Sequence, residues 1–93
     1  MSIEVRIPTV LRKHTDGEKK VSGSGATLRE LVIDLQSRNA DLAEAIVGED
    51  GNLHRFINVY VNDEDVRFAG GLEAEVKDGD TVTILPAVAG GSR

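Results

Sequence analysis

Hydrophobic positions fall into short alternating runs near both ends of the chain, with one helical stripe between them. At the start, Ile3, Val5 and Ile7 alternate with charged residues, and a period of two predicts a half-buried strand. Pro8 has no N–H for a sheet ladder, so we expect it to end this strand or lie at an edge. The beginning of the chain therefore predicts a strand with one face on a core.

A polar segment follows, and it contains few apolar anchors. Residues 9–20 include the turn-forming pair Asp16-Gly17 and are interpreted as a wide hairpin connection. Residues 18–22 form a weak second strand candidate. The Ser-Gly-Ser-Gly run at 22–25 separates this strand from the next element.

The clearest helix signal begins at Thr27. Glu30 stands three positions later, as in a capping box, which satisfies amide groups at a helix start. One apolar stripe follows at helical spacing, formed by Leu28, Leu31, Val32 and Leu35. We expect this helix to end near 38–39 and a second short helix to cover 41–47, before a loop at 48–52.

The strongest strand signal covers residues 56–62, where Ile57, Val59 and Val61 share one face. A turn is expected at 62–65, with a further short strand at 66–68. Leu72 and Val76 then provide a short apolar anchor before the next turn.

The last stretch combines a turn, a strand and a tail. Asp78-Gly79-Asp80 is a tight-turn signal, and the β-branched run at 81–85 predicts a strand. By alternation, Val82 and Ile84 face the helix, whereas Thr83 and Leu85 face outward. Pro86 is expected to stop the strand.

These elements predict an α+β domain with two layers, because one amphipathic helix and one sheet face must bury each other. A mixed sheet of four or five strands packed on one main helix is the β-grasp arrangement, although the pattern alone allows other α+β topologies. We assign residues 1–86 to this domain. Residues 87–93 form a flexible tail of mostly small residues.

Composition narrows the function. The net charge of −5 argues against nucleic acid, which requires a basic face, and it weakly favours a partner with a basic patch. The chain has no cysteine, which excludes disulfides and thiol chemistry. No apolar run approaches the ~20 residues of a membrane span, and no signal peptide is visible, so we expect a cytoplasmic location. His14 and His54 are expected to be solvated rather than metal ligands.

The sequence resembles the ubiquitin-like sulfur carriers of the ThiS/MoaD type over essentially its whole length. The most specific stretches are LHRFINVYVNDEDVRF at 53–68 and LPAVAGG at 85–91, with a further likeness at 7–9. Within the family, it most resembles the actinobacterial carriers of cysteine biosynthesis. The resemblance implies the β-grasp fold, with the first and last strands parallel at the centre of the sheet.

The resemblance also implies that the chain is a protein co-substrate and not an enzyme. Gly91 would be adenylated and converted to a thiocarboxylate that donates sulfur. The residues before it, which would enter partner active sites, are Pro86, Ala87, Val88, Ala89 and Gly90. Glycine lacks a Cβ, so its backbone can pass through a narrow channel.

The implied partners are three enzymes. A ubiquitin-activating-type adenylyltransferase and sulfurtransferase would use ATP, a PLP-dependent cysteine synthase would accept the sulfur, and a JAMM-type zinc peptidase would release the product. The chain itself would bind no cofactor. Tyr60 and Leu85 on the outward sheet face are the expected partner interface.

Other functions remain open at this point. Within the family, the chain could be the small subunit of molybdopterin synthase or a thiazole-type carrier. From another class, it could be a ubiquitin-like modifier joined to proteins through Gly91, or an interaction domain with an inert tail.

The chain departs from the family pattern at Ser92 and Arg93, which follow the Gly-Gly pair. The carbonyl of Gly91 is therefore in a peptide bond and cannot be adenylated. Either a peptidase removes Ser92 and Arg93, which we favour, or these two residues were added during cloning.

Overall fold

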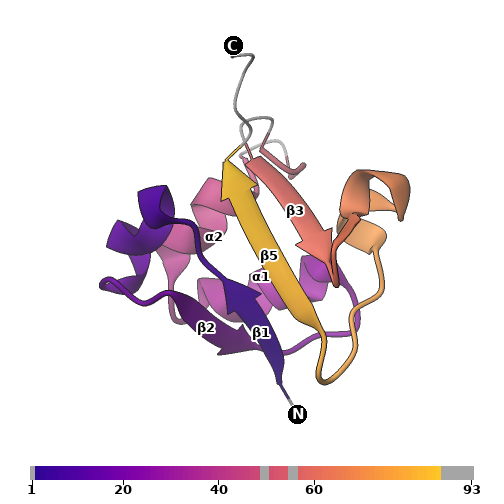
Figure 1. Cartoon of the computed structure of the whole chain (residues 1–93), viewed down its shortest axis with the longest axis horizontal. Coiled ribbons are helices and arrows are strands. Elements are labelled where there is room, and N and C mark those ends of the chain that lie inside the picture. Colours follow the sequence, from indigo (N-terminus) through magenta and orange to yellow (C-terminus); the bar gives the residue numbers. More distant parts are fainter. Residues whose placement is uncertain (1, 49–50, 55–56, 87–93) are drawn as a thin grey trace.

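A computed structural model describes residues 2–48, 51–54 and 57–86 as a mixed sheet of five strands with helices against one face (Figure 1). The strands are β1 (Ile3–Arg6), β2 (Lys20–Gly23), β3 (Ile57–Val61), β4 (Glu64–Asp65) and β5 (Thr81–Pro86). The helices are α1 (Leu28–Gln36) and α2 (Ala40–Ile46), with 3₁₀ helices η1 (Thr9–Thr15), η2 (Val66–Phe68) and η3 (Gly71–Glu73). Among the described residues, no helix combines the length and hydrophobicity needed to cross a lipid bilayer.

The strands lie in the order β2-β1-β5-β3-β4, so β5 is the central strand. It runs parallel to β1, with Val5 opposite Val82, and antiparallel to β3, with Val59 opposite Ile84. The parallel pairing of the first and last strands is the one expected for a β-grasp fold. The predicted α+β class is thus confirmed, with five strands in the sheet.

Helix α1 begins where the sequence predicts. The Thr27 hydroxyl accepts a hydrogen bond from the Glu30 amide at 3.2 Å, and the Glu30 carboxylate accepts one from the Ala26 amide at 3.0 Å. Glu30 therefore reaches one residue further back than in a standard capping box, in which it would bond the amide of Thr27. The first interaction satisfies an amide that the first helical turn leaves unpaired, and the second fixes the residue before the cap.

The core lies between α1 and the inner face of the sheet. Its largest fully buried side chains come mainly from the predicted stripe and from alternate strand positions, with one from α2 and one from η2, namely Ile3, Val5, Leu28, Leu31, Leu35, Leu42, Val66, Val82 and Ile84. Burying one such side chain contributes roughly 1.5–3 kcal/mol. The expected anchors Leu72 and Val76 are also buried.

The segment predicted as a plain hairpin connection contains η1, which the sequence prediction missed. Polar residues dominate η1, but Leu11 packs on the core from it. The buried Thr15 hydroxyl lies 2.9 Å from the Glu18 carbonyl, which joins the end of η1 to the chain that enters β2. The second strand begins two residues later than predicted.

The prediction of a strand at 66–68 is wrong, because these residues form η2. The short strand is instead β4, which immediately precedes it. The Asp65 carboxylate accepts a hydrogen bond from the Arg67 amide at 2.9 Å and caps η2. A capping aspartate before buried Val66 favours a helical turn over continued pairing with β3.

Strands β3 and β4 are joined by the two-residue turn Asn62-Asp63. Both residues have positive φ angles, 51° and 73°, as a type I′ hairpin turn requires. Asparagine and aspartate tolerate this left-handed conformation better than other residues with a side chain. The turn predicted at 62–65 is therefore present but shorter, because Glu64 and Asp65 already belong to β4.

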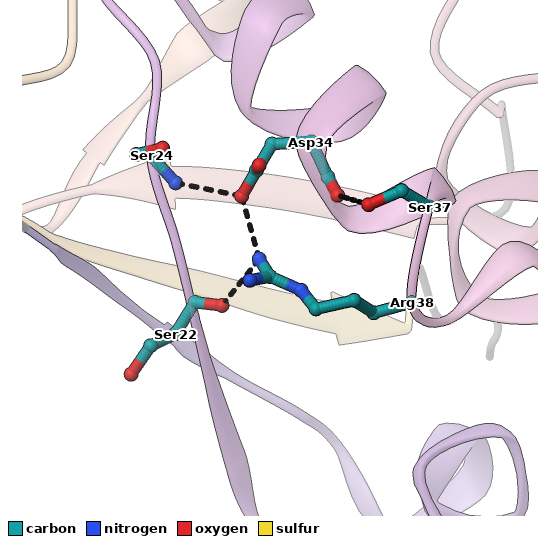
Figure 2. Close-up of polar contacts among 5 residues, drawn as sticks. All are labelled: Ser22, Ser24, Asp34, Ser37 and Arg38. Atoms are coloured by element: carbon teal, nitrogen blue, oxygen red, sulfur yellow. Dashed lines mark hydrogen bonds and ion pairs between the residues drawn. The ribbon is translucent and has the colours of Figure 1, made fainter.

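The open edge of β2 is tied to α1 by side chains that replace a neighbouring strand (Figure 2). Asp34 accepts a hydrogen bond from the Ser24 amide at 3.0 Å, and Arg38 donates to the Ser22 carbonyl at 3.0 Å. Asp34 and Arg38 also form an ion pair with each other, at 2.6 Å. This arrangement covers part of an edge that would otherwise offer unpaired backbone groups.

Two glycines let the chain pass close to α1 at this edge. A Cβ on Gly23 would lie 2.6 Å from a methyl carbon of Leu31, and a Cβ on Gly25 would lie 2.6 Å from the Leu31 backbone nitrogen. The run at 22–25 therefore does more than separate β2 from α1. Its two glycines allow α1 to pack closely against the end of β2.

Candidate functional site

The candidate site is the surface around the end of β5, from which the C-terminal tail leaves the domain. Pro86 is the last residue of β5 and lies opposite Ile57 of β3. The strand therefore includes Pro86, one residue beyond the predicted stretch of 81–85. The predicted tail positions, Ala87, Val88, Ala89, Gly90, Gly91, Ser92 and Arg93, lie outside the described residues.

The start of β5 is fixed by the predicted turn at 78–80. Gly79 has a φ of +91°, which suits glycine, and its amide donates to the Ser2 carbonyl at 3.0 Å. The Asp80 carboxylate accepts a hydrogen bond from the Lys77 amide at 2.8 Å. These bonds tie the turn to itself and to the chain entering β1, so they set the position of β5.

A second connection joins this turn to the hairpin after β3. The Asn62 side chain donates to Asp80 at 2.9 Å and accepts from the Thr81 amide at 3.0 Å. The hydrogen bond from Asn62, followed by that from the Lys77 amide, holds the pKa of Asp80 below its ordinary value. The ionised form of Asp80 is thus favoured in the folded state.

The outward sheet face carries both predicted interface residues. Tyr60 lies opposite Thr83, and Leu85 lies opposite Asn58, so Tyr60 and Leu85 are diagonal neighbours on antiparallel strands. Leu85 is 44% exposed and Tyr60 is half-buried. The surface around them is mixed, because each is paired with a polar residue.

The orientation predicted for β5 is confirmed. Val82 and Ile84 are each 1% exposed beneath the sheet, whereas Leu85 points to the outer face. The strongly buried pair holds β5 in place along its length. Its outward residues remain accessible beside the tail exit.

A groove borders the tail exit between η1 and the end of β5, with a volume of about 410 Å³. We call it the exit groove, and its lining includes Arg6, Val10, Arg12, Leu85 and Pro86. The sequence prediction missed it because η1 was expected to be a connecting loop. A signal for η1 itself was the Val10-Leu11 pair, two apolar residues that follow Thr9 within the polar segment.

The outer face next to the exit groove carries a line of charges on β1 and β2. Glu4 lies 2.9 Å from Arg6 and 3.7 Å from Lys20, so one carboxylate stands between two cations. The hydrogen bond from Arg6, with a smaller effect of Lys20, lowers the pKa of Glu4. This cluster has more positive than negative charge at neutral pH.

A larger cavity, of about 640 Å³, lies on the helix side, away from the outer sheet face. Its lining includes Val32, Ile33, Ala43 and Val47 from and around α1 and α2. Within the described part of the chain, no group of histidine and acidic side chains is arranged to hold a metal ion.

A mixed β-sheet with parallel first and last strands, one main helix and a tail leaving the central strand defines a ubiquitin-like β-grasp protein. The model of the ThiS family matches residues 5–91, and this chain belongs to that family. The resemblance to the ThiS/MoaD carriers inferred from the sequence is thereby confirmed.

Known relatives agree with this assignment. The sulfur carrier protein CysO of Mycobacterium tuberculosis is 55% identical over 93 residues, which cover 98% of this chain and 100% of that protein. A solved chain from the BexX/CysO complex of Amycolatopsis orientalis is 66% identical, covers 96% of this chain and 99% of its own, and has a TM-score of 0.87. The likeness to these proteins supports a sulfur-carrier role.

A more distant relative belongs to another class. The small archaeal modifier protein SAMP1 of Methanosarcina acetivorans is 27% identical, with a TM-score of 0.81. The match covers 97% of this chain and 96% of that one. The same fold therefore occurs in a protein named as a modifier.

Proposed function

We propose that this chain carries sulfur as a thiocarboxylate on Gly91 and donates it for cysteine biosynthesis. The observation that carries the proposal is the combination of a Gly-Gly pair, four and five residues after Pro86, with a full-length likeness to CysO. The central strand β5 holds Pro86 at the surface, and the tail continues from there. The chain acts as a co-substrate, and its partners supply the catalysis.

The loading chemistry requires two steps. The Gly91 carboxylate attacks the α-phosphorus of ATP on an activating partner of the ubiquitin-activating type, and pyrophosphate leaves. Hydrosulfide delivered by the partner then attacks the carbonyl carbon of the acyl adenylate, AMP leaves, and loss of the S–H proton gives the thiocarboxylate. Sulfur is thus carried on the main chain, which suits a protein with no cysteine.

The tail composition fits insertion into a partner. Ordering the five residues from Ala87 to Gly91 costs roughly 5–10 kcal/mol in backbone entropy. Pro86 adds nothing to this cost, because it is already ordered as the last residue of β5. Contacts elsewhere on the domain offset the cost, and Tyr60 and Leu85 on the outer face are the proposed contributors.

Loading also requires that Gly91 has a free carboxylate. In the sequence, Ser92 and Arg93 follow Gly91, and we propose that a JAMM-type zinc peptidase removes them. The same class of peptidase would later release cysteine from a Gly91–cysteine adduct. A PLP-dependent synthase would form that adduct from the thiocarboxylate and an activated serine.

The decisive test is intact mass spectrometry of the chain ending at Gly91 after incubation with ATP, sulfide and an activating enzyme. A mass increase equal to replacement of one oxygen by sulfur is expected, and it should disappear when Gly91 is deleted. An unchanged mass with every activating enzyme of the host would refute the carrier function. If the thiocarboxylate forms, it can be incubated separately with the enzymes of cysteine, molybdopterin and thiazole synthesis. The enzyme that takes up its sulfur would identify the pathway.

Conjugation to proteins is the second candidate, favoured by the likeness to the archaeal modifier SAMP1. In this case the Gly91 acyl group would pass to lysine amines of target proteins. A ladder of high-mass conjugates in host cells that requires Gly91 would support conjugation. A thiocarboxylate without such a ladder would support the carrier function alone.

A further inference from the structure

The exit groove lies where a partner that acts on Gly91 has to approach. Pro86 forms part of its wall, and five fully extended residues from Pro86 to Gly91 span about 17 Å. A partner that holds Gly91 in an active site must therefore come close to the surface around Pro86. The charge and the apolar lining of this groove therefore indicate what kind of partner surface can bind there.

The charge of the exit groove is opposite to the charge of the chain. Its only charged lining residues, among those that the structure describes, are Arg6 and Arg12. The whole chain has a net charge of −5. A partner surface that meets the tail exit therefore meets cations, and the weak expectation of a basic partner does not hold for this groove.

Arg12 is the stronger of the two candidate contacts. Its Nε donates to the Ile7 carbonyl at 3.2 Å, which fixes the guanidinium at the groove. No carboxylate in the described part of the chain forms an ion pair with Arg12, whereas Arg6 is paired with Glu4. A positioned guanidinium that has no acidic partner among the described residues is well suited to bind a carboxylate through two hydrogen bonds.

The groove also has exposed apolar groups. Val10 of η1 is 60% exposed and Leu85 of β5 is 44% exposed, and both line the groove with Pro86. An apolar side chain placed between them would remove this surface from water. The groove thus combines a cation with an apolar wall.

We propose that the exit groove binds a segment of the adenylating partner in which a carboxylate stands next to an apolar side chain. The carboxylate pairs with Arg12, and the apolar side chain packs between Val10 and Leu85. This inference rests on the proposed function, because the occupant is the enzyme that activates Gly91. Long-range attraction between the acidic segment and the arginines also steers the two proteins together, so association weakens with salt.

The test uses the chain ending at Gly91 and the host adenylating enzyme, with ATP–pyrophosphate exchange as the readout. Arg12→Glu reverses the proposed contact, and Lys13→Glu makes the same charge change on the same 3₁₀ helix outside the groove lining. Val10→Ser removes the apolar contact, and Ile33→Ser is its control, since Ile33 is also 60% exposed but lies on α1. Thermal unfolding of each variant shows whether it is folded.

We expect Arg12→Glu to raise the KM for the carrier about ten-fold or more and to flatten its salt dependence. Val10→Ser should raise the KM several-fold, whereas both controls should stay near the wild type. Equal effects of each variant and its control would overturn the inference while leaving the carrier function intact. If Arg12→Glu does not fold, Val10→Ser against Ile33→Ser decides the outcome.

ATP–pyrophosphate exchange with the unsubstituted chain ending at Gly91 distinguishes failure of the proposed function from failure of the groove inference. If the chain ending at Gly91 supports no exchange with the host enzyme and does not bind it in calorimetry, the proposed function and the groove inference both fail. If exchange occurs, only the comparison of variants bears on the groove.

Discussion

The side-chain amide of Asn62 donates a hydrogen bond to the Asp80 carboxylate at 2.9 Å and so joins the turn after β3 to the turn before β5. Its oxygen accepts from the Thr81 amide at 3.0 Å, at the first residue of β5. One side chain therefore aligns the beginning of the central strand with its neighbour. The position of β5 in turn sets the position of Pro86, where the tail leaves.

Asn62→Gly removes this bridge and keeps a residue that accepts the positive φ. Each hydrogen bond contributes a net ~1 kcal/mol, so we expect the free energy of unfolding to fall by about 1–2 kcal/mol in urea denaturation. Asp63→Gly is the matched control, since Asp63 has the other positive φ of the same turn. Equal losses in the two variants would show that the bridge contributes nothing.

The ionised form of Asp80 should stabilise the fold in a defined pH range. Its pKa is lowered in the folded state from an ordinary value of 3.8, first by the hydrogen bond from Asn62 and then by that from Lys77. The stabilisation is therefore complete above the unfolded pKa and is lost as the pH falls through the folded pKa.

We expect Asp80→Asn to lower Tm at pH 7, and the difference from wild type to shrink as the pH is lowered from about 4 towards 2. Thermal unfolding across this range measures the effect. A difference that stays constant down to pH 2 would contradict a role of the Asp80 charge. Glu4→Gln gives a comparison with the same sign, because the pKa of Glu4 is also lowered.

Gly25→Ala should destabilise the domain, although Gly→Ala at an unstrained position often stabilises by ~0.4–1 kcal/mol. The new Cβ would lie 2.6 Å from the Leu31 nitrogen and 2.9 Å from the Glu30 carbonyl carbon, and both are backbone atoms that cannot rotate away. We expect a loss of about 1–3 kcal/mol in chemical denaturation. Ser24→Ala is the control, because it keeps the amide that donates to Asp34. A Gly25→Ala variant as stable as wild type would show that α1 can shift at no cost.

Tyr60→Ala combined with Leu85→Ala should impair activation by the adenylating partner without unfolding the domain. Both side chains lie on the outer face, and tyrosine is one of the residues most often found at interface hot spots, where truncation costs about 2 kcal/mol or more. We therefore expect the KM in pyrophosphate exchange to rise roughly ten-fold or more. Phe68→Ala removes an 84% exposed aromatic group on η2 and serves as control. Unimpaired exchange by the double variant would rule out this face as the interface.

The fold was predictable where one local rule was sufficient. The stripe from Leu28 to Leu35 and the cap at Thr27 defined α1, and alternation at Val82 and Ile84 defined the buried face of β5. The parallel pairing of β1 with β5 came only from the family resemblance. Local patterns do not specify which distant strands pair.

The errors have physical causes. Residues 66–68 look like a strand, but the Asp65 carboxylate caps a helical turn there, an interaction that competes with strand pairing. The helix η1 was missed because one packed leucine, Leu11, holds a mainly polar segment. The exit groove depends on η1 lying against the end of β5, so no local signal could reveal that Arg12 and Leu85 line one surface.

The central position of β5 also affects how the protein is made. Strands β1 and β3 do not pair with each other, so the sheet cannot close until the last strand has been synthesised and has inserted between them. Such non-local pairing slows folding compared with a helical domain of similar size. A chain that stops before Thr81 would lose both the middle of its sheet and its tail. The same few residues at the end of the chain therefore complete the fold and connect it to the tail that carries Gly91.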